Sequence, residues 1–238
     1  MLITVLTLFP EMFPGALQYS LLGKSLGKLW NIKAINIRDF SEDKHHTVDD
    51  TPYGGGAGMV MKPDVVNRAL EYAIALYDEI PTIVYMTPKG KVFNHQIAQR
   101  ISENASGIVF LCGRYEGIDQ RVIDYWKINH NMIEISIGDY VLFGGEIPAM
   151  VVIESCMRFQ SGIMNNETSV FDESFSNGLL EYPQYTRPET WNEENVPRVL
   201  LSGNHKEINK WRLKQAEAIT KEIRPDLWKR YGDKNENK

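Results

Sequence analysis

The sequence predicts an α/β fold built on an open, mostly parallel sheet. Short stretches of strand character alternate with stretches that carry apolar residues at helical spacing, a pattern typical of α/β domains. The stretch Gly107–Cys112 is almost continuously apolar, as expected for a strand buried on both faces. The stretch Ile133–Met150 runs from an alternating strand through glycine-bearing loops into a helix with Pro148 in its first turn. Open α/β sheets bind ligands at such strand ends.

The predicted elements follow one another in a regular order. Strands are expected at 2–9, 32–37, 82–86 and 107–112, and from Ile133 onward. Helices are expected at 11–29, 64–77, 94–103 and 147–159, with a short one before Ile133. The helix over 147–159 is apolar on nearly all sides, so most of its faces must be covered. It is therefore either a core helix or a subunit interface.

The segment 39–62 interrupts this pattern with a long polar loop that contains the glycine-rich stretch Tyr53–Met59. Its length indicates a binding or mobile segment. No Gly-Lys-Ser/Thr follows the glycines, so this is not a phosphate-binding loop of the familiar type. The adjacent His45 and His46 lack a third ligand at suitable spacing, and no resident metal site is predicted.

Composition indicates an ordinary globular protein, with 43% hydrophobic and 24% charged residues and a net charge of −5. The two cysteines, Cys112 and Cys156, lie inside apolar runs, which favours a reducing compartment over a disulfide framework or a zinc site. No apolar run approaches the ~20 residues that span a bilayer, and the first residues do not resemble a signal peptide. We expect a cytoplasmic protein without a membrane segment.

The C-terminal part differs from the rest in charge. Between Val196 and Tyr231, nine Lys or Arg residues stand against four acidic ones, a local balance of +5. This predicts either a polyanionic partner or simply a solvated helical face. Helices are expected at 206–224 and 225–231, with Ser202–His205 capping the first. The small polar stretch 161–172 is the best linker, so we expect domains at 1–160 and 173–238.

Three strands end in loops with glycine or proline, at 87–90, 113–117 and 138–145. Backbone groups in such loops can approach a ligand closely, which favours a small-molecule cleft over three plain turns. A Gly-x-Gly-x-x-Gly pattern is absent, so a dinucleotide site is unsupported. Arg158 lies in an apolar run and needs an anionic partner, structural or substrate-borne. Asp172 and Glu173 could cap a helix or act as a general base.

These motifs together resemble the bacterial tRNA (guanine-N1)-methyltransferases, knotted methyltransferases of the SPOUT class that methylate the guanosine just 3′ of the anticodon. The resemblance extends over nearly the whole chain, in the family's order. The matching segments are Tyr53–Met59 with Lys62-Pro63, Met86–Gly90, Leu111–Asp119, Glu134–Met150, Leu179–Pro188 and Val199–His205.

The resemblance implies an α/β domain with a trefoil knot at its C-terminal end, followed by a small helical domain that contacts tRNA. Knots are rare exceptions to the rules of chain connection, and periodicity does not reveal them. The resemblance also implies a homodimer whose sites are shared between subunits. The implied methyl donor is S-adenosylmethionine, and a divalent cation such as Mg²⁺ near Glu116 is left open.

Site residues are expected in and around these motifs, some of them by their position in the family. Those expected to bind the donor are Met86, Thr87, Pro88, Gly113, Ile137, Gly138, Asp139, Tyr140, Val141, Leu142, Gly144 and Gly145. Those expected to bind the RNA substrate are Arg114, Tyr115, Glu116 and His205.

The expected catalytic residues are Arg158 and one carboxylate, and here the sequence departs from the family. The family's catalytic aspartate lies in an Asp-Ser-Phe triplet, whereas this chain has Glu173-Ser174-Phe175 with Asp172 one residue earlier. The sequence leaves open which of the two acts. A carboxylate that takes the guanine N1 proton and an arginine that faces O6 suit this methyl transfer.

Overall fold

The computed structural model describes residues 1–104, 106–164 and 173–236. The chain divides into two compact units, Met1–Asn165 and Asn166–Lys238, and each is described by itself. Most of the predicted linker 161–172 lies outside the described residues, and so does Asp172.

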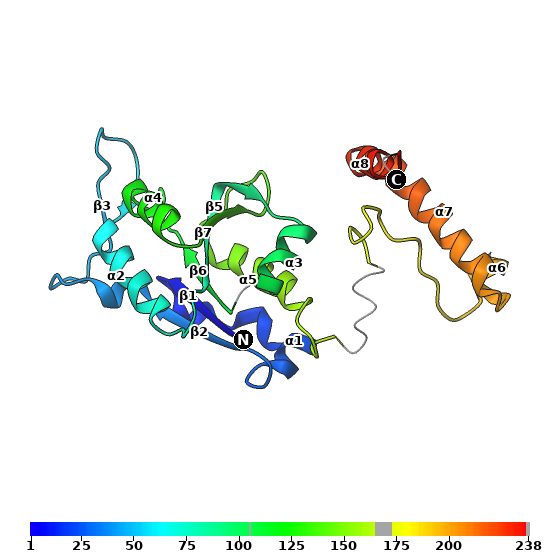
Figure 1. Cartoon of the computed structure of the whole chain (residues 1–238), viewed down its shortest axis with the longest axis horizontal. Coiled ribbons are helices and arrows are strands. Elements are labelled where there is room, and N and C mark those ends of the chain that lie inside the picture. Colours follow the sequence, from blue (N-terminus) through cyan, green and yellow to red (C-terminus); the bar gives the residue numbers. More distant parts are fainter. Residues whose placement is uncertain (105, 165–172, 237–238) are drawn as a thin grey trace. The chain divides into compact units, whose positions relative to one another are not determined.

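The first unit is built on a sheet of five parallel strands (Figure 1). In spatial order these are β2 (Asn31–Asn36), β1 (Leu2–Thr7), β6 (Gly107–Cys112), β5 (Thr82–Val92) and β7 (Met132–Ser136). All residues of the central strand β6 are buried, as its apolar run predicts. The α/β class and the parallel sheet are confirmed.

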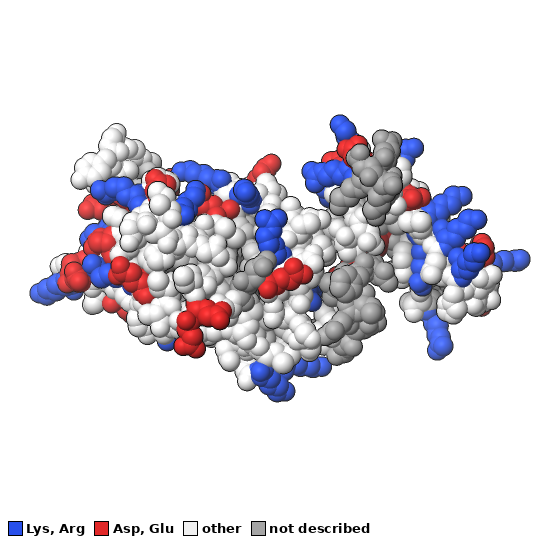
Figure 2. Space-filling view, viewed as in Figure 1, with Lys and Arg blue, Asp and Glu red and all other residues white. Residues whose placement is uncertain are grey.

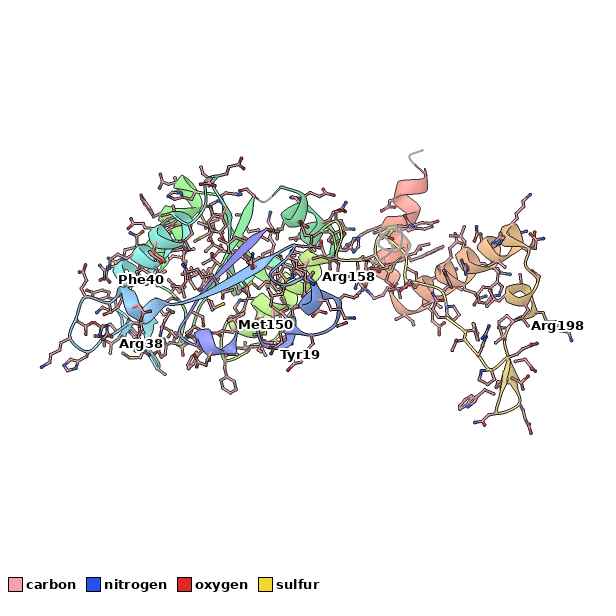
Figure 3. All side chains as sticks on the ribbon, turned by 90° about the horizontal axis from the view of Figure 1, so that it is seen from below. Tyr19, Arg38, Phe40, Met150, Arg158 and Arg198 are labelled. Carbon is pink, nitrogen blue, oxygen red and sulfur yellow. The ribbon has the colours of Figure 1, made fainter. Side chains whose placement is uncertain are left out.

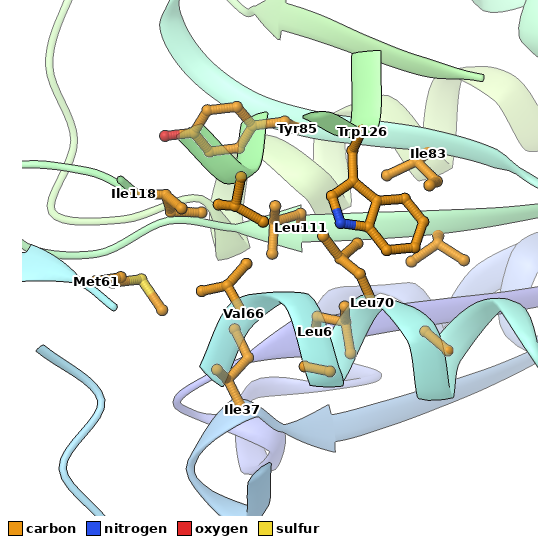
Figure 4. Packing of buried hydrophobic residues seen from close by; sticks show 14 of the residues in the cluster. Leu6, Ile37, Met61, Val66, Leu70, Ile83, Tyr85, Leu111, Ile118 and Trp126 are labelled. Atoms are coloured by element: carbon orange, nitrogen blue, oxygen red, sulfur yellow. The ribbon is translucent and has the colours of Figure 1, made fainter. Parts of the chain in front are cut away.

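Helices cover both faces of this sheet. On one face lie α2 (Pro63–Ile74) and α4 (Gln120–Asn129), which bury residues such as Val66, Leu70 and Trp126 against β-strand residues (Figure 4). On the other face lie α1 (Ser20–Ser25), α3 (His95–Asn104) and α5 (Glu146–Met157). Strand side chains alternate between the two clusters, as the period of two requires. The sheet is therefore the middle layer of three.

Helix α5 buries one side and exposes another. Its buried residues include Ala149, Val152 and Ile153, while Ile147 and Val151 are 51% and 42% exposed. The core role expected for this apolar helix is thus confirmed. The exposed apolar side chains on its other side are compatible with the alternative role, that of a subunit interface.

Two element predictions were wrong. The stretch 11–29 is not one helix but the 3₁₀ turns Pro10–Met12 and Gly15–Gln18 followed by α1. Pro14 lacks an N–H donor and Gly15 has φ +54°, so a continuous helix is broken there. Strand β5 does not end at Met86 but continues to Val92, with its register on β7 shifted between Met86 and Lys91, an irregularity that accommodates Pro88.

The long loop predicted at 39–62 is partly ordered by short elements. A 3₁₀ turn covers Ile37–Phe40, and β3 (Asp49–Asp50) pairs antiparallel with β4 (Val60–Met61). The tip between these strands projects outward, and Tyr53 is fully exposed. None of the helices in the described part of the chain is long and apolar enough to cross a membrane.

The second unit contains the hairpin β8 (Thr190–Trp191) and β9 (Glu194–Asn195), then α6 (Arg198–Leu201), α7 (His205–Ile223) and α8 (Pro225–Glu236). The predicted cap is confirmed, because the Asn204 side chain accepts a hydrogen bond from the Glu207 amide. Lys and Arg side chains gather over the region of α6 and α7 (Figure 2). Those of Lys206, Lys210 and Lys214 are exposed.

Tyr77 ties α2 to the sheet and supplies a testable pH dependence. Its hydroxyl lies 2.8 Å from Thr4 Oγ1 and 3.0 Å from the Ile108 carbonyl oxygen. Burial raises the pKa of Tyr77 to about 12 from its ordinary value of 10.0. Because ionisation is easier in the unfolded chain, the stabilisation is complete below pH 10 and is lost as pH rises toward 12.

We therefore expect Tyr77→Phe to lower the free energy of unfolding by about 1 kcal/mol at pH 8, with the deficit shrinking between pH 10 and pH 12. Urea unfolding of both proteins across this range measures the difference. A deficit that stays constant up to pH 12 would contradict the assignment.

Candidate active site

A cleft of about 270 Å³ lies at the carboxyl ends of β6 and β7, beside the middle of the longer strand β5. This is where an open parallel sheet places its ligands. Its walls come from the second half of β5, from the segment after β6 and from the segment between β7 and α5. Of the three loops that the sequence predicts to converge, 113–117 and 138–145 contribute to this cleft, whereas residues 87–89 line it as part of strand β5.

Backbone contacts hold these segments close together. The Gly145 amide donates a hydrogen bond to the Gly113 carbonyl oxygen at 3.1 Å. A Cβ at Gly145 would lie 2.7 Å from Cys112 Cα, and Gly138 has φ +143°. Glycine is therefore required at these two positions, by close approach in one and by backbone conformation in the other.

Most of the residues predicted for the donor site lie together in this cleft. Eleven of the twelve line it: Met86, Thr87, Pro88, Gly113, Ile137, Gly138, Tyr140, Val141, Leu142, Gly144 and Gly145. The twelfth, Asp139, is exposed and is not among the described residues that line the cleft.

Of the predicted substrate residues, Arg114, Tyr115 and Glu116 also line the cleft. Glu116 contacts the glycine-rich loop: its amide donates to the Met59 carbonyl oxygen at 2.9 Å. At Gly58, with φ +85°, an added Cβ would lie 2.6 Å from Glu116 Cγ. The long loop thus reaches the rim of the cleft at Glu116. His205 is the first residue of α7, in the second unit.

The predicted catalytic residues lie elsewhere in the chain. Arg158 caps the C-terminal end of α5 and is exposed (Figure 3), and it is not among the described residues that line the cleft. Glu173 belongs to the second unit and begins a turn in which Phe175 has φ +77°. A bulky residue rarely adopts this conformation, and such strain often marks functional segments.

Sequence reasoning missed the roles of several polar residues that line the cleft or lie next to it. Glu146, only 1% exposed, pairs with Arg114. Burial and the nearby Glu146 charge raise the pKa of the Cys112 thiol well above its ordinary value, so Cys112 stays protonated. Burial likewise raises the pKa of Tyr85. The sequence offered one signal for Glu146, which is its position as a carboxylate at the start of an apolar helix. Acidic residues are common in the first turn of helices, so this signal did not single Glu146 out.

A second ion pair lies at the cleft, where a Glu134 carboxylate oxygen is 2.6 Å from Lys127 Nζ.

Among the described residues, no group of three or more His, Cys, Asp or Glu side chains is placed to hold a metal ion.

Comparison with known proteins relates this chain to a single family. The model of the tRNA (guanine-1)-methyltransferase family TrmD matches residues 1–230. A tRNA (guanine-N(1)-)-methyltransferase of Wolbachia pipientis subsp. Culex pipiens is 54% identical over 228 residues, covering 94% of this chain and 96% of its own. Proteins of the same name from Rhodospirillum rubrum and Pelagibacter ubique are 50% and 48% identical over 228 residues. They cover 95% of this chain, and 92% and 96% of their own. On this evidence the chain belongs to the tRNA (guanine-1)-methyltransferase family.

Proposed function

We propose that the protein transfers a methyl group from S-adenosylmethionine to N1 of the guanosine 3′ of the anticodon in tRNA. The observation that carries this proposal is the cleft beside β5 and the ends of β6 and β7, in a chain of this family. Eleven of the residues expected for the donor site line that cleft. A tRNA substrate also agrees with the cytoplasmic location that the cysteines predict.

The composition of the cleft fits the proposed donor. Pro88, Ile137 and Leu142 offer apolar surface to an adenine ring, while the glycines at 113, 138, 144 and 145 leave backbone groups accessible for polar contacts. When bound, S-adenosylmethionine supplies an electrophilic methyl group on a sulfonium. The protein's part is to hold the guanine in line with that methyl group and to exclude water.

The proposed chemistry assigns one task to each catalytic residue. Glu173 or Asp172 takes the proton from guanine N1, a step that typically contributes ~10²–10⁴-fold to the rate. Arg158 faces O6 and stabilises the negative charge that develops there. Glu116, at the rim of the cleft, holds either the guanine edge or a divalent cation beside it.

The second unit is proposed to bind the tRNA. The exposed lysines of α7 can contact backbone phosphates, which makes binding dependent on salt. The target guanine must leave the anticodon loop to enter a cleft, and Tyr115 and His205 offer rings on which an unstacked base can rest.

We further propose that the first unit is knotted and that the protein is a homodimer with shared sites. The proposal of a knot rests on membership of the family; the Gly145–Gly113 hydrogen bond adds only that the segment after β7 contacts the segment after β6. Dimerisation is supported by exposed apolar side chains, including Phe143 at 98% and Ile147 at 51%. Arg158 stands one helix length, about 18 Å, from the start of α5 at the cleft, so a second subunit would supply the arginine.

Subunit complementation tests this shared site. Gly138→Ala strains the cleft, because a Cβ there would lie 2.7 Å from the Tyr140 ring, and Arg158→Ala removes the catalytic arginine. Each variant alone should be inactive. After unfolding and refolding together, the mixture should recover about a quarter of the wild-type rate, because half of the dimers hold one intact site. Recovery at the level of the separate variants would exclude a site shared between subunits.

The donor and the target nucleotide are tested separately. Calorimetry should show S-adenosylmethionine binding to the wild type, with weaker binding to Gly138→Ala. Labelled methyl groups should enter a tRNA transcript with guanosine 3′ of the anticodon, but not the same transcript with adenosine there. Equal incorporation into both transcripts would favour a related methyltransferase that acts on another nucleotide.

A further inference from the structure

Glu146 is a carboxylate buried at the start of a core helix. Its side chain is only 1% exposed, and the helix that contains it is otherwise largely apolar. Burying a charge is costly unless partners compensate it. The partners here are Arg114, whose Nη2 lies 3.0 Å from Oε2 and whose Nε donates to Oε1 at 3.1 Å. Thr7 Oγ1 also donates to Oε1, at 2.7 Å.

Two further contacts engage the Arg114 guanidinium. Its Nη1 donates to the Phe143 carbonyl oxygen at 3.3 Å, and its Cζ lies 4.3 Å from the centre of the Phe9 ring. The Arg114 side chain is only 19% exposed. An arginine held by a carboxylate, a carbonyl oxygen and a ring is oriented into the protein and has fewer N–H donors left for a phosphate than an exposed arginine.

These contacts join three segments that are distant in sequence. Thr7 and Phe9 are at the end of β1, Arg114 follows β6, and Phe143 and Glu146 bracket the passage from the cleft loop into α5. Gly144 lies between the paired groups, since an added Cβ would meet Glu146 Oε2 at 2.5 Å and Arg114 Cδ at 2.6 Å. Phe143 and Gly144 therefore lie directly against this ion pair.

We infer that Arg114, Glu146 and Thr7 are positioning residues that hold residues 141–145 in the shape that forms one wall of the donor cleft. In this role Arg114 acts on the donor through the loop and does not contact the RNA backbone, in contrast to the substrate-binding role expected for it from the sequence. The inference rests on the proposed function, because it takes the cleft as the donor site.

Two variants and a matched control test this assignment. Glu146→Gln keeps the shape of the side chain but removes its charge, and Thr7→Val removes one hydrogen bond to Glu146. The control is Asp64→Asn, which removes the carboxylate of a surface pair with Arg68 at 3.2 Å. The measurements are the dissociation constant for S-adenosylmethionine, hydrogen exchange of a peptide covering residues 137–150, and tRNA binding without donor.

Glu146→Gln should raise the donor dissociation constant about tenfold or more and speed exchange in the peptide, because misplaced cleft groups bind poorly. Thr7→Val should shift both measurements in the same direction by less. The KM for the donor should rise while the KM for tRNA stays within twofold. Asp64→Asn should change none of these quantities.

The contrary result is equally specific. If Glu146→Gln binds donor within twofold of the wild type with unchanged exchange, the inference is wrong; if that variant does not fold, Thr7→Val decides by the same two measurements. If Arg114→Gln, which removes the charge, weakens donor-free tRNA binding and lowers its salt slope by about one, Arg114 is a phosphate contact. A wild type that binds no donor would refute the proposed function, while the exchange data would still report on the loop.

Discussion

Gly145→Ala should lose donor binding and 1–3 kcal/mol of stability, about the cost of forcing extra atoms into a packed site. The added Cβ would lie 2.7 Å from Cys112 Cα and 3.1 Å from the Gly113 nitrogen. Both neighbours are backbone atoms at the end of the fully buried strand β6, so neither can move aside as a flexible side chain would. The two cleft segments must separate, which also breaks the Gly145–Gly113 hydrogen bond.

Calorimetry with S-adenosylmethionine and urea unfolding measure the two losses. The control is Gly232→Ala in α8, where an added Cβ has no described atom within 4 Å. That variant should bind donor normally and be unchanged or slightly more stable, because alanine favours helix over glycine by about 1 kcal/mol. Donor binding retained by Gly145→Ala would show that the close approach of these segments is not needed for the site.

The second large effect concerns the proposed catalytic pair. We expect Arg158→Ala to lower kcat by about 10²–10³, the usual cost of losing one group that stabilises transition-state charge. Of Glu173→Gln and Asp172→Asn, the one that removes the base should lower kcat by ~10²–10⁴, and the other should have a much smaller effect. A side chain one residue along or one methylene longer does not place its oxygen equally well.

Single-turnover rates and donor dissociation constants separate catalysis from binding. All three variants should bind S-adenosylmethionine within twofold of the wild type. Full activity in both carboxylate variants would show that the base is neither of them. A loss of donor affinity as large as the loss of rate in Arg158→Ala would indicate a structural arginine.

Local pattern predicted much of the fold. The strand Gly107–Cys112 has the predicted bounds, because a short apolar run has few other stable placements. The stretch 11–29 was predicted wrongly because its helical spacing outweighed Pro14 and Gly15. The continuation of β5 past Met86 depends on pairing with β7, which is about 45 residues away and leaves no local signal.

In the candidate site, too, local features could be predicted from the sequence and contacts between distant residues could not. Glycines at strand ends predicted that 113–117 and 138–145 would meet, and they line one cleft. The Arg114–Glu146–Thr7 contacts were missed because they join residues 32 and 139 positions apart. Only the folded chain brings such side chains together. The identity of the donor, the target base and the roles of Arg158 and the carboxylates came from resemblance, since spacing alone indicates a cleft but not its chemistry.

The most direct test of the central claim is to identify the methylated nucleoside and its position. Unmodified tRNA transcript would be incubated with the protein and methyl-labelled S-adenosylmethionine, then digested and analysed by mass spectrometry. We predict labelled 1-methylguanosine in the fragment containing the nucleotide 3′ of the anticodon. Label at another atom or at another position would contradict the account. So would the absence of label when the protein is correctly folded and binds the donor.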